Sequence, residues 1–482
     1  MESPLHFYPA LADGAALAAP CPVPAASWRE RLARALAGVG LWLRRHRGWV
    51  MATQWSVVLF YGALVVVPAF VPATASDAHI WNDLRLFAAF IFWGLWWPGV
   101  MVATVSLGRV WCGLFCPEGF LSELASRRGL GLGVPRWLKW PGWPFVAFVT
   151  TTVYGQLISV YEYAEAALLI LGGSTLAAIV VGFTFGRGKR VWCHYLCPAS
   201  GVFAVLAKIA PLHYRVDRAA WDRAAPERFD CPPLVDVRRM TSASDCHSCA
   251  RCAGQRDAVR LAARTPFAEA LSPAAKPRHR DALTLLFGVL GIATMAFQWT
   301  VSPWCLQLKL ALADWLVEHD LLALLGDGAP WWLLTHYPQN NDVFTWLDGL
   351  VVLAYTVGGG MALGALLAVG PLVAAALVRA SSPLADWRRF AFALVPLAAA
   401  SVVLGLTMTT ATQLRGEHLL LPWLPAARAT LLTAGGIGSL WLAFELVRRC
   451  GASILRRLAA FLALCLPVVT MSAMWALAFF VW

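Results

Sequence analysis

Long apolar stretches alternate with short polar segments along most of the chain. A helix needs roughly 20 mostly apolar residues to cross the hydrocarbon core of a bilayer. Stretches of this kind occur at 49–71, 85–107, 141–161, 164–186, 283–304, 347–378, 390–412, 427–447 and 458–481. The pattern therefore predicts an all-α polytopic membrane protein with about nine transmembrane helices.

A longer polar segment separates the fourth predicted span from the fifth. We therefore divide the chain into four parts. They are an N-terminal tail at 1–48, four spans at 49–210, the polar segment at 211–282, and a five-helix transmembrane region at 283–482.

Arginine and lysine are concentrated on alternate sides of the predicted spans. The tail before the first span holds six arginines, and the segments after the second, fourth, sixth and eighth spans are also basic. The loop at 72–84 has no basic residue, and the loop at 305–346 has only Lys309. Basic loops stay in the cytoplasm. The tail and the polar segment are therefore predicted to be cytoplasmic, with the C-terminus outside.

The composition agrees with a bilayer environment. Charged residues make up 14% of the chain and apolar residues 59%, whereas soluble domains carry about 25% charged residues. The 25 tryptophans suit membrane–water interfaces. A net charge of +12 would suggest nucleic acid on a soluble protein, but here the basic residues flank apolar spans. We expect no nucleic-acid partner.

A nine-residue motif occurs twice, at 109–117 and 190–198. Each copy reads Arg-Val-Trp-Cys-x3-Cys-Pro and follows a pair of spans, so the first four spans are predicted to be a duplicated hairpin. The copies enter the membrane in the same sense, which predicts a pseudo-twofold axis along the membrane normal. The cysteine pairs would then face each other; they are Cys112 with Cys116, and Cys193 with Cys197.

Two facing cysteine pairs would form one site with four thiolates. Residues four apart share a helix face, and the proline after each pair disfavours a continuing helix. Such a site could hold an iron–sulfur cluster or a soft ion such as Cu(I). The alternative is four small buried residues that pack between helices.

Four further cysteines lie in the polar segment. Cys246, Cys249 and Cys252 have the two-residue spacing of a bacterial ferredoxin run, but no fourth cysteine follows them. The candidates for a fourth ligand are Cys231, which precedes Pro232, and a cysteine of the membrane motifs. Four thiolates would also suit structural zinc. Because cytoplasmic thiols stay reduced, we expect no disulfides at these eight cysteines.

Several kinds of site are absent from the sequence. None of the ten histidines falls in the middle of a predicted span, which excludes a transmembrane haem b held by paired histidines. No phosphate-binding loop or dinucleotide fingerprint occurs. Since no protein ligands connect the cytoplasmic cysteines with the far side of the membrane, a lipid-soluble quinone is the simplest carrier. The spans also lack the buried charges expected of a transporter.

The repeated motif, followed by a ferredoxin-type cysteine run, resembles the membrane polyferredoxins over about residues 50–282. This family includes the quinol dehydrogenase subunit of periplasmic nitrate reduction, the nitrous-oxide reductase maturation regulator, and an assembly factor of the copper-containing cytochrome oxidase. The resemblance implies [4Fe-4S] clusters, a bacterial inner-membrane location, and electron delivery linked to quinol or copper. The matching residues are Cys112, Cys116, Cys193, Cys197, Cys246, Cys249 and Cys252.

This chain departs from the family in two respects. Family members usually carry two complete ferredoxin runs, whereas this chain has one incomplete run, so one or two clusters are expected. The five C-terminal spans have no role that the family motif assigns.

The leading hypothesis is a membrane electron-transfer protein. It would pass electrons between quinol or a cytoplasmic donor and a respiratory or maturation partner, in contact with membrane lipid and the quinone pool. Residues 211–282 would form a small ferredoxin-like iron–sulfur segment. The alternative is a copper-handling or copper-reducing assembly factor. Whether the chain acts as a quinol dehydrogenase or metal reductase component stays open at this point.

Overall fold

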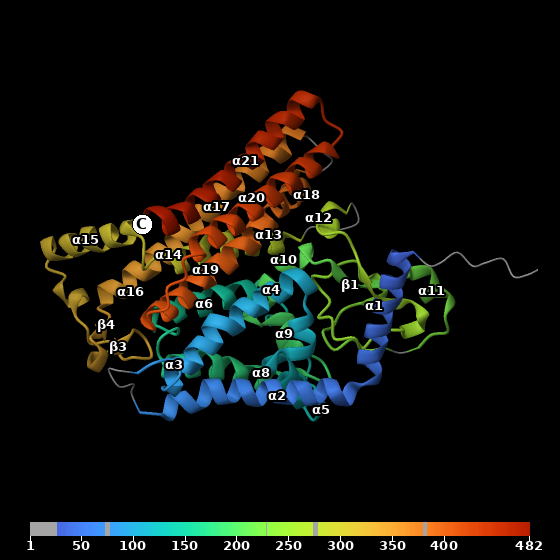
Figure 1. Ribbon diagram of the computed structural model, residues 1–482, viewed down its shortest axis with the longest axis horizontal. Helices are drawn as coiled ribbons and strands as arrows, with labels where there is room; N and C mark the ends of the chain where they lie inside the picture. The colour runs from blue at the N-terminus through green and yellow to red at the C-terminus, as the bar shows by residue number, and fades with distance from the viewer. Residues whose placement is uncertain (1–26, 73–77, 228, 273–277, 379–382) are drawn as a thin grey trace, which may run out of the picture.

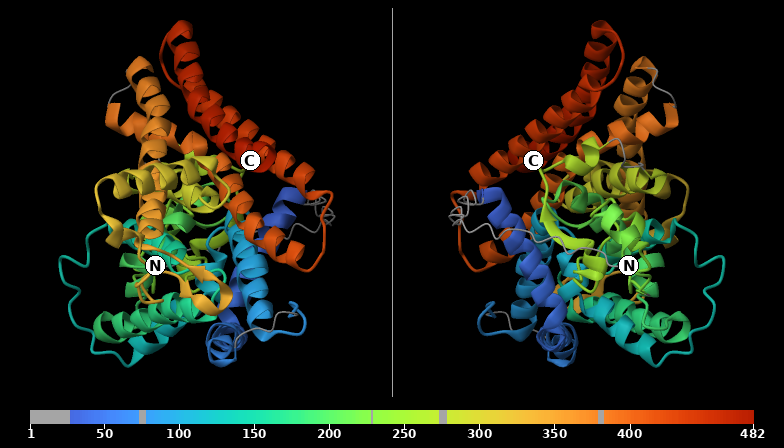
Figure 2. Two further views of the ribbon diagram at one scale, coloured as in Figure 1. Left: turned by 90° about the vertical axis from the view of Figure 1, so that its left-hand side faces the viewer. Right: turned by 90° about the vertical axis from the view of Figure 1, so that its right-hand side faces the viewer.

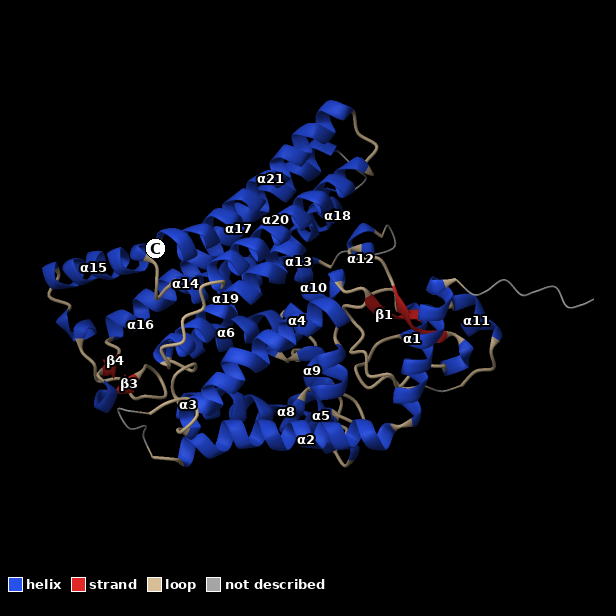
Figure 3. Cartoon of the chain, viewed as in Figure 1, coloured by secondary structure: helices blue, strands red, loops and turns tan. Residues whose placement is uncertain are grey.

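The computed structural model describes residues 27–72, 78–227, 229–272, 278–378 and 383–482, with only the backbone described at 383–386. Most of this part of the chain is helical (Figures 1 and 3). Within it, eight helices are long and apolar enough to cross a membrane: Arg47–Phe70, Leu84–Leu107, Ala164–Phe185, His279–Gln298, Trp346–Val378, Trp387–Gly416, Leu424–Arg448 and Ile454–Val481. The predicted all-α polytopic architecture is confirmed.

The predicted span at 141–161 is the exception. Its helix, α6 (Trp143–Leu157), has 15 residues, which is about 22 Å of helix against a core of about 30 Å. Three consecutive threonines and Gln156 lower its apolar character. Ser159 then takes a left-handed conformation (φ 50°) in the turn that follows. Of the nine predicted spans, eight are therefore long apolar helices in the described chain, and the ninth is this shorter helix.

The long helices contain short segments of different pitch. In the N-terminal half they are α2 (Arg47–Val66) with η1 (Val67–Phe70), then α3 (Leu84–Ala89), η2 (Phe90–Trp96) and α4 (Trp97–Leu107), then α7 (Ala164–Ala167), η4 (Leu168–Gly172) and α8 (Gly173–Phe185). In the C-terminal half they are α13 (His279–Leu283), η8 (Thr284–Ala293) and α14 (Thr294–Gln298), then α16 (Trp346–Leu353), η11 (Ala354–Gly359) and α17 (Gly360–Val378), then α18 (Pro383–Ala391), η12 (Phe392–Leu394) and α19 (Val395–Gly416), then α20 (Leu424–Arg448), α21 (Ile454–Ala476) and η13 (Leu477–Val481).

The two cysteine motifs lie on short helices that follow α4 and α8. The first comprises η3 (Trp111–Phe115) and then α5 (Pro117–Arg127), and the second α9 (Val191–Tyr195) and then α10 (Pro198–Leu206) with η5 (Ala207–Ile209). Helix α5 packs against α8, and α10 packs against α4 and α6. The contact between α5 and α8 is close, because a Cβ on Gly182 would lie 2.3 Å from the carbonyl oxygen of Ser122. This reciprocal packing fits the predicted duplication.

The polar segment forms a small unit beyond the ends of α2, α4 and α8 (Figure 1, right). Strand β1 (Leu212–Val216) pairs antiparallel with β2 (Val259–Ala263), with Leu212 opposite Ala263. The remaining elements are α11 (Arg218–Arg223), η6 (Val237–Arg239), η7 (Gln255–Asp257) and α12 (Ala268–Leu271). Tyr214, Trp221 and Val259 are among the residues of its apolar core.

The predicted N-terminal tail contains a helix. Residues 1–26 lie outside the described residues, but α1 (Trp28–Arg45) begins with a capping box formed by Ser27 and Glu30. It packs against β2. The prediction of a tail at 1–48 missed this helix, because a single amphipathic helix gives no apolar run long enough to count as a span.

The C-terminal helices form the largest apolar core and lean away from the first half (Figure 2). Helix α19 contacts α4 and η2 of the first half, and the Thr410 hydroxyl donates to the Gly94 carbonyl oxygen at 3.0 Å. The loop before α16 holds α15 (Pro303–Glu318), η9 (Leu322–Leu325), β3 (His336–Tyr337), η10 (Pro338–Asn340) and β4 (Asp342–Val343). Strands β3 and β4 lie at the opposite end of the molecule from β1 (Figure 3).

Candidate metal centres

The four motif cysteines line one cavity of about 260 Å³. Cys112 and Cys193 are 9% and 7% exposed. The two halves of the repeat meet here, because a Cβ on Gly119 would lie 3.4 Å from the Cys193 sulfur. The structure therefore brings together Cys112, Cys116, Cys193 and Cys197, as the duplicated motif predicts.

The second cysteine of each pair lies at a helix N-terminus. Cys116 caps α5 and Cys197 caps α10, each followed by a proline at the first helical position. The Cys116 sulfur accepts a hydrogen bond from the Gly119 amide at 3.4 Å. The positive end of a helix dipole stabilises a thiolate. The Cys-Pro pair thus ends one helix and starts another. The N-terminus of the new helix offsets part of the effect of burial, which raises the pKa of Cys116 and Cys197 well above the ordinary thiol value.

The other four cysteines line a second, more enclosed cavity. Cys231 lies there with Cys246, Cys249 and Cys252, next to Tyr214 and Met240. Between the two named candidates for a fourth ligand, the geometry thus brings Cys231 to the ferredoxin-type run. None of the four motif cysteines lines this cavity.

The loop that carries Cys249 has an unusual backbone. Ser248 and Ala250, on either side of it, are left-handed, with φ of 51° and 61°. This conformation is costly for residues other than glycine and is common at functional sites. It can turn successive backbone amides toward an anionic centre, as in iron–sulfur sites. The Ser248 amide donates to the Cys246 sulfur at 3.3 Å.

The two cavities adjoin each other. His247 lines both of them. A Cβ on Gly113 would lie 2.0 Å from the His247 carbonyl oxygen, so only glycine lets the loop approach the first motif this closely. His194 occupies the matching position of the second motif, where its Nδ1 lies 3.0 Å from the Pro233 carbonyl oxygen. The two motifs therefore differ at this position because a different loop packs against each: the loop with His247 against Gly113, and the loop with Pro233 against His194.

A buried carboxylate joins the motifs to the loop. Glu123 on α5 is 2% exposed, and it pairs with Arg190 at 2.8 Å and with Arg251. Arg190 also donates to the Cys112 carbonyl oxygen at 2.6 Å. The two arginines hold the pKa of Glu123 at about 2, despite the opposing effect of burial. Glu123 belongs to no motif that the sequence shows, although the arginine repeated at 109 and 190 indicates a need for a buried counter-charge.

The cysteines are poorly suited to remain bare thiolates. Burial raises the pKa of Cys193 and Cys246 to about 12 and that of Cys231 to about 11. A metal centre reverses this preference, because its positive charge favours the thiolate. No disulfide joins any of the described cysteines.

Three buried polar atoms fit a cluster with anionic sulfurs. Arg109 Nε and His247 Nδ1, beside the first cavity, and the Tyr214 hydroxyl, beside the second, have no hydrogen-bond partner within the described residues. Such orphaned groups are costly unless a ligand satisfies them. In the described part of the chain, no group of three or more Cys, His, Asp and Glu side chains could hold a single metal ion.

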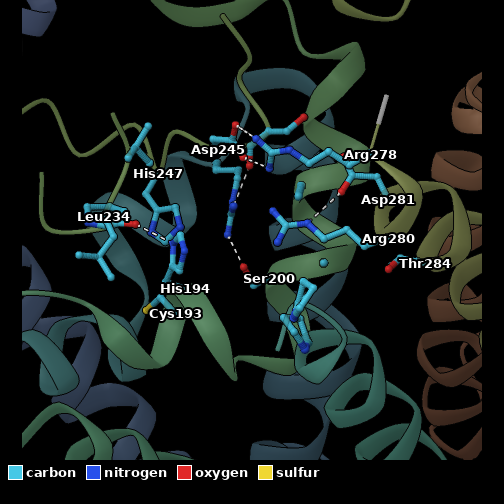
Figure 4. A pocket seen from close by; sticks show the side chains of 18 of the residues that line it. Cys193, His194, Ser200, Leu234, Asp245, His247, Arg278, Arg280, Asp281 and Thr284 are labelled. Carbon is cyan, nitrogen blue, oxygen red and sulfur yellow. Dashed lines mark hydrogen bonds and ion pairs between the residues drawn. The ribbon is translucent and has the colours of Figure 1, made fainter. Parts of the chain in front are cut away.

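A polar pocket of about 310 Å³ opens beside the first cavity (Figure 4). Cys193 and His194 line one side of it. On the other side, Asp245 forms paired hydrogen bonds with Arg278, each of 2.5 Å. This pocket gives the second motif a polar approach from the end of the molecule that carries β1 and β2.

Comparisons with known proteins agree with these sites. A 4Fe-4S binding domain family matches residues 89–139 and 169–215, which contain both cysteine motifs. The loop with Cys246, Cys249 and Cys252 lies outside the matched residues. No solved structure matches the chain.

Curated relatives match less than half of this chain. The putative electron transport protein YccM of Escherichia coli is 23% identical over 41% of this chain and 64% of its own length. The ferredoxin-type protein NapH of Haemophilus influenzae is 26% identical over 42% and 77%. Protein NirI of Paracoccus denitrificans is 27% identical over 44% and 34%.

The fold and the motifs define a class of polytopic membrane proteins with paired cysteines at the ends of duplicated hairpins. Over residues 89–139 and 169–215 the chain matches a 4Fe-4S binding domain, and it is similar to ferredoxin-type and electron transport proteins.

Proposed function

We propose that the chain is a membrane electron-transfer protein with two [4Fe-4S] sites. One would be held by Cys112, Cys116, Cys193 and Cys197, and the other by Cys231, Cys246, Cys249 and Cys252. The observation that carries the proposal is that each set of four cysteines lines its own cavity and that the two cavities adjoin at His247. Clusters of this kind supply one-electron transfer.

The protein's own residues would hold and tune the two sites. Burial excludes water from the sulfurs, and helix N-termini together with left-handed loop residues direct amides toward them. Arg109 and Arg190 bring positive charge to the motifs, and Glu123 neutralises only the second of these arginines. Arg109, which has no ion-pair partner among the described residues, would therefore leave a positive charge beside the motif site, and nearby charge is one of the factors that set cluster potentials.

We place both sites on the cytoplasmic side of the bacterial inner membrane. The basic segments that predict this side are the tail, the loop after α4 and the polar segment. The polar segment and strands β3 and β4 lie at opposite ends of the molecule (Figure 1). Electrons would then enter or leave at the cytoplasmic face.

The first cavity supports exchange of electrons with a quinol. It extends from the motif cysteines between aromatic side chains that include Tyr61, Phe92, Trp96 and Trp111. The Trp96 and Trp111 rings meet edge to face at 5.2 Å. An apolar, aromatic cavity with a few polar groups is typical of a site for a small organic molecule. A redox partner protein would complete the chain of transfer.

The same cavity gives the C-terminal region a role. Val402 and Leu406 of α19 form part of its wall, and so do Val289 and Ala293 of η8. Two of the last five candidate spans, His279–Gln298 and Trp387–Gly416, would thus close a quinol site on the side where the duplicated hairpin alone would leave it open.

Serine substitutions test the ligand assignment. After anaerobic purification, Cys193→Ser and Cys249→Ser should each lose one set of paramagnetic signals and about half of the iron. Cys305→Ser is the matched control, because Cys305 is buried in α15 and lines neither cavity. Unchanged iron and sulfide in both variants would refute the assignment. Copper or zinc in place of iron would instead support the assembly-factor or structural alternatives.

A further inference from the structure

One side of α1 carries an apolar stripe that is largely exposed, although the Trp42 ring stacks on His46. Its members are spaced three or four residues apart and so share one helix face; they are Trp28, Leu32, Ala35, Val39 and Trp42, all exposed. The Trp28 side chain is 64% exposed and that of Trp42 is 50% exposed. A stripe of this length is unusual on a surface that faces only water.

The stripe is not needed to attach α1 to the protein. A different face does this: a Cβ on Gly40 would lie 3.3 Å from the Leu261 Cβ on β2. The Arg44 side chain also donates to the Ala253 carbonyl oxygen at 2.7 Å. The helix thus contacts the iron–sulfur segment on one face and leaves a second apolar face free.

Exposed arginines border the stripe. Arg31, Arg34 and Arg45 are exposed, and by helical spacing they lie along one edge of it. None of the three has an ion-pair partner among the described residues. An apolar stripe beside arginines is the pattern of a helix that lies in a membrane interface.

The position of α1 fits the same environment. Only His46 separates it from α2, which begins a candidate membrane span at Arg47. Figure 1 shows α1 turning away from the axis of α2 and running across its end. The stripe therefore lies at the height where α2 would enter the bilayer.

We propose that α1 lies in the headgroup layer of an anionic leaflet and holds the β1–β2 segment against the membrane. The stripe would face the acyl chains, and the arginines would bind lipid phosphates, which attract basic side chains near the surface. This inference goes beyond the proposed function. It requires that α2 spans the membrane, and it does not require any metal centre.

Tryptophan emission tests the proposal on the full chain in nanodiscs. The difference in emission between the natural chain and a double variant, Trp28→Phe with Trp42→Phe, is the fluorescence of the two stripe tryptophans. In nanodiscs of brominated phosphatidylcholine and phosphatidylglycerol, this component should be quenched by the lipid and shielded from acrylamide. Quenching by acrylamide and not by brominated lipid would overturn the proposal.

Three further variants test the lipid charge and the apolar stripe separately. Arg31→Gln with Arg34→Gln should lower the ratio of docked to undocked α1 by a factor of about five per arginine in anionic nanodiscs. In pure phosphatidylcholine this variant and the natural chain should behave alike. Val39→Asp should expose the stripe to acrylamide, whereas Gly38→Asp should not, because a side chain at Gly38 meets open space. Equal behaviour of Val39→Asp and Gly38→Asp would contradict the stripe's assignment to lipid.

Discussion

Arg190 Nε donates to Glu123 Oε2 at 2.8 Å across the two halves of the duplicated hairpin. Both side chains are almost fully buried, at 1% and 2% exposed. Because Glu123 also pairs with Arg251 of the cysteine loop, one carboxylate connects both membrane motifs with the ferredoxin-type run. A single buried charge thus contributes to the relative placement of the two candidate metal centres, together with the close approach of Gly113 to His247.

Loss of this charge should loosen the loop. Glu123→Gln leaves Arg190 and Arg251 without a counter-charge, and removal of one partner from a buried pair typically costs about 3–5 kcal/mol. We expect a lower free energy of unfolding and a weaker magnetic interaction between the two paramagnetic centres. Denaturant titration and electron paramagnetic resonance measure these quantities.

The matched control is Asp222→Asn. Asp222 pairs with Arg238 in the same segment at 3.0 Å, but both side chains are largely exposed. An exposed pair contributes about 1 kcal/mol or less. Equal effects of the two substitutions would argue against the role of Glu123.

The same pair predicts a pH dependence. The pKa of Glu123 is about 2 in the folded chain, below the ordinary value of about 4.3 for glutamate. Its contribution to stability should therefore be complete above about pH 5 and should decline as the pH falls from there toward 2. The stability difference between the natural chain and Glu123→Gln, measured at several pH values, should shrink over this range. A constant difference would contradict the ion pair.

Gly113→Ala should displace the cysteine loop from the first motif. The added Cβ would meet the His247 carbonyl oxygen at 2.0 Å, and overpacking of this kind costs about 1–3 kcal/mol. We expect loss of iron from the site at Cys246, Cys249 and Cys252, seen by metal analysis and resonance signals. Gly133→Ala should be neutral, because its Cβ would meet no atom within 4 Å. Full iron content in Gly113→Ala would show that the close approach is not needed.

Filling the aromatic cavity should slow quinol oxidation without loss of iron. Val402 lines the cavity from α19 and is 7% exposed, so Val402→Trp would occupy part of its volume. Val373→Trp on α17 is the control, because Val373 is 42% exposed. Steady-state reduction of the chain by a quinol analogue provides the measurement. Equal rates in the two variants would count against a quinol site in this cavity.

The sequence predicts the spans and motifs well because their signals are local. Apolar runs of sufficient length mark eight helices, and a motif repeated with its flanks marks the paired cysteines. The length of α6 was overestimated. Its threonines and Gln156 interrupt the apolar run, and the turn at Ser159 then ends it.

Other features depend on contacts between distant parts of the chain, which no local pattern shows. Glu123 meets Arg251 across 128 positions. Gly113 is needed only because His247 comes against it. Helix α1 is stabilised by β2, more than two hundred residues later, so the sequence before the first span reads as a tail. Cys231 joins the later cysteines only through the fold of the segment between them.

The iron and acid-labile sulfide content of the full chain, purified without oxygen, tests the account most directly. Two [4Fe-4S] sites predict roughly eight iron and eight sulfide per chain, with two sets of paramagnetic signals after reduction. A colourless protein without iron, or one that holds zinc and no sulfide, would contradict it.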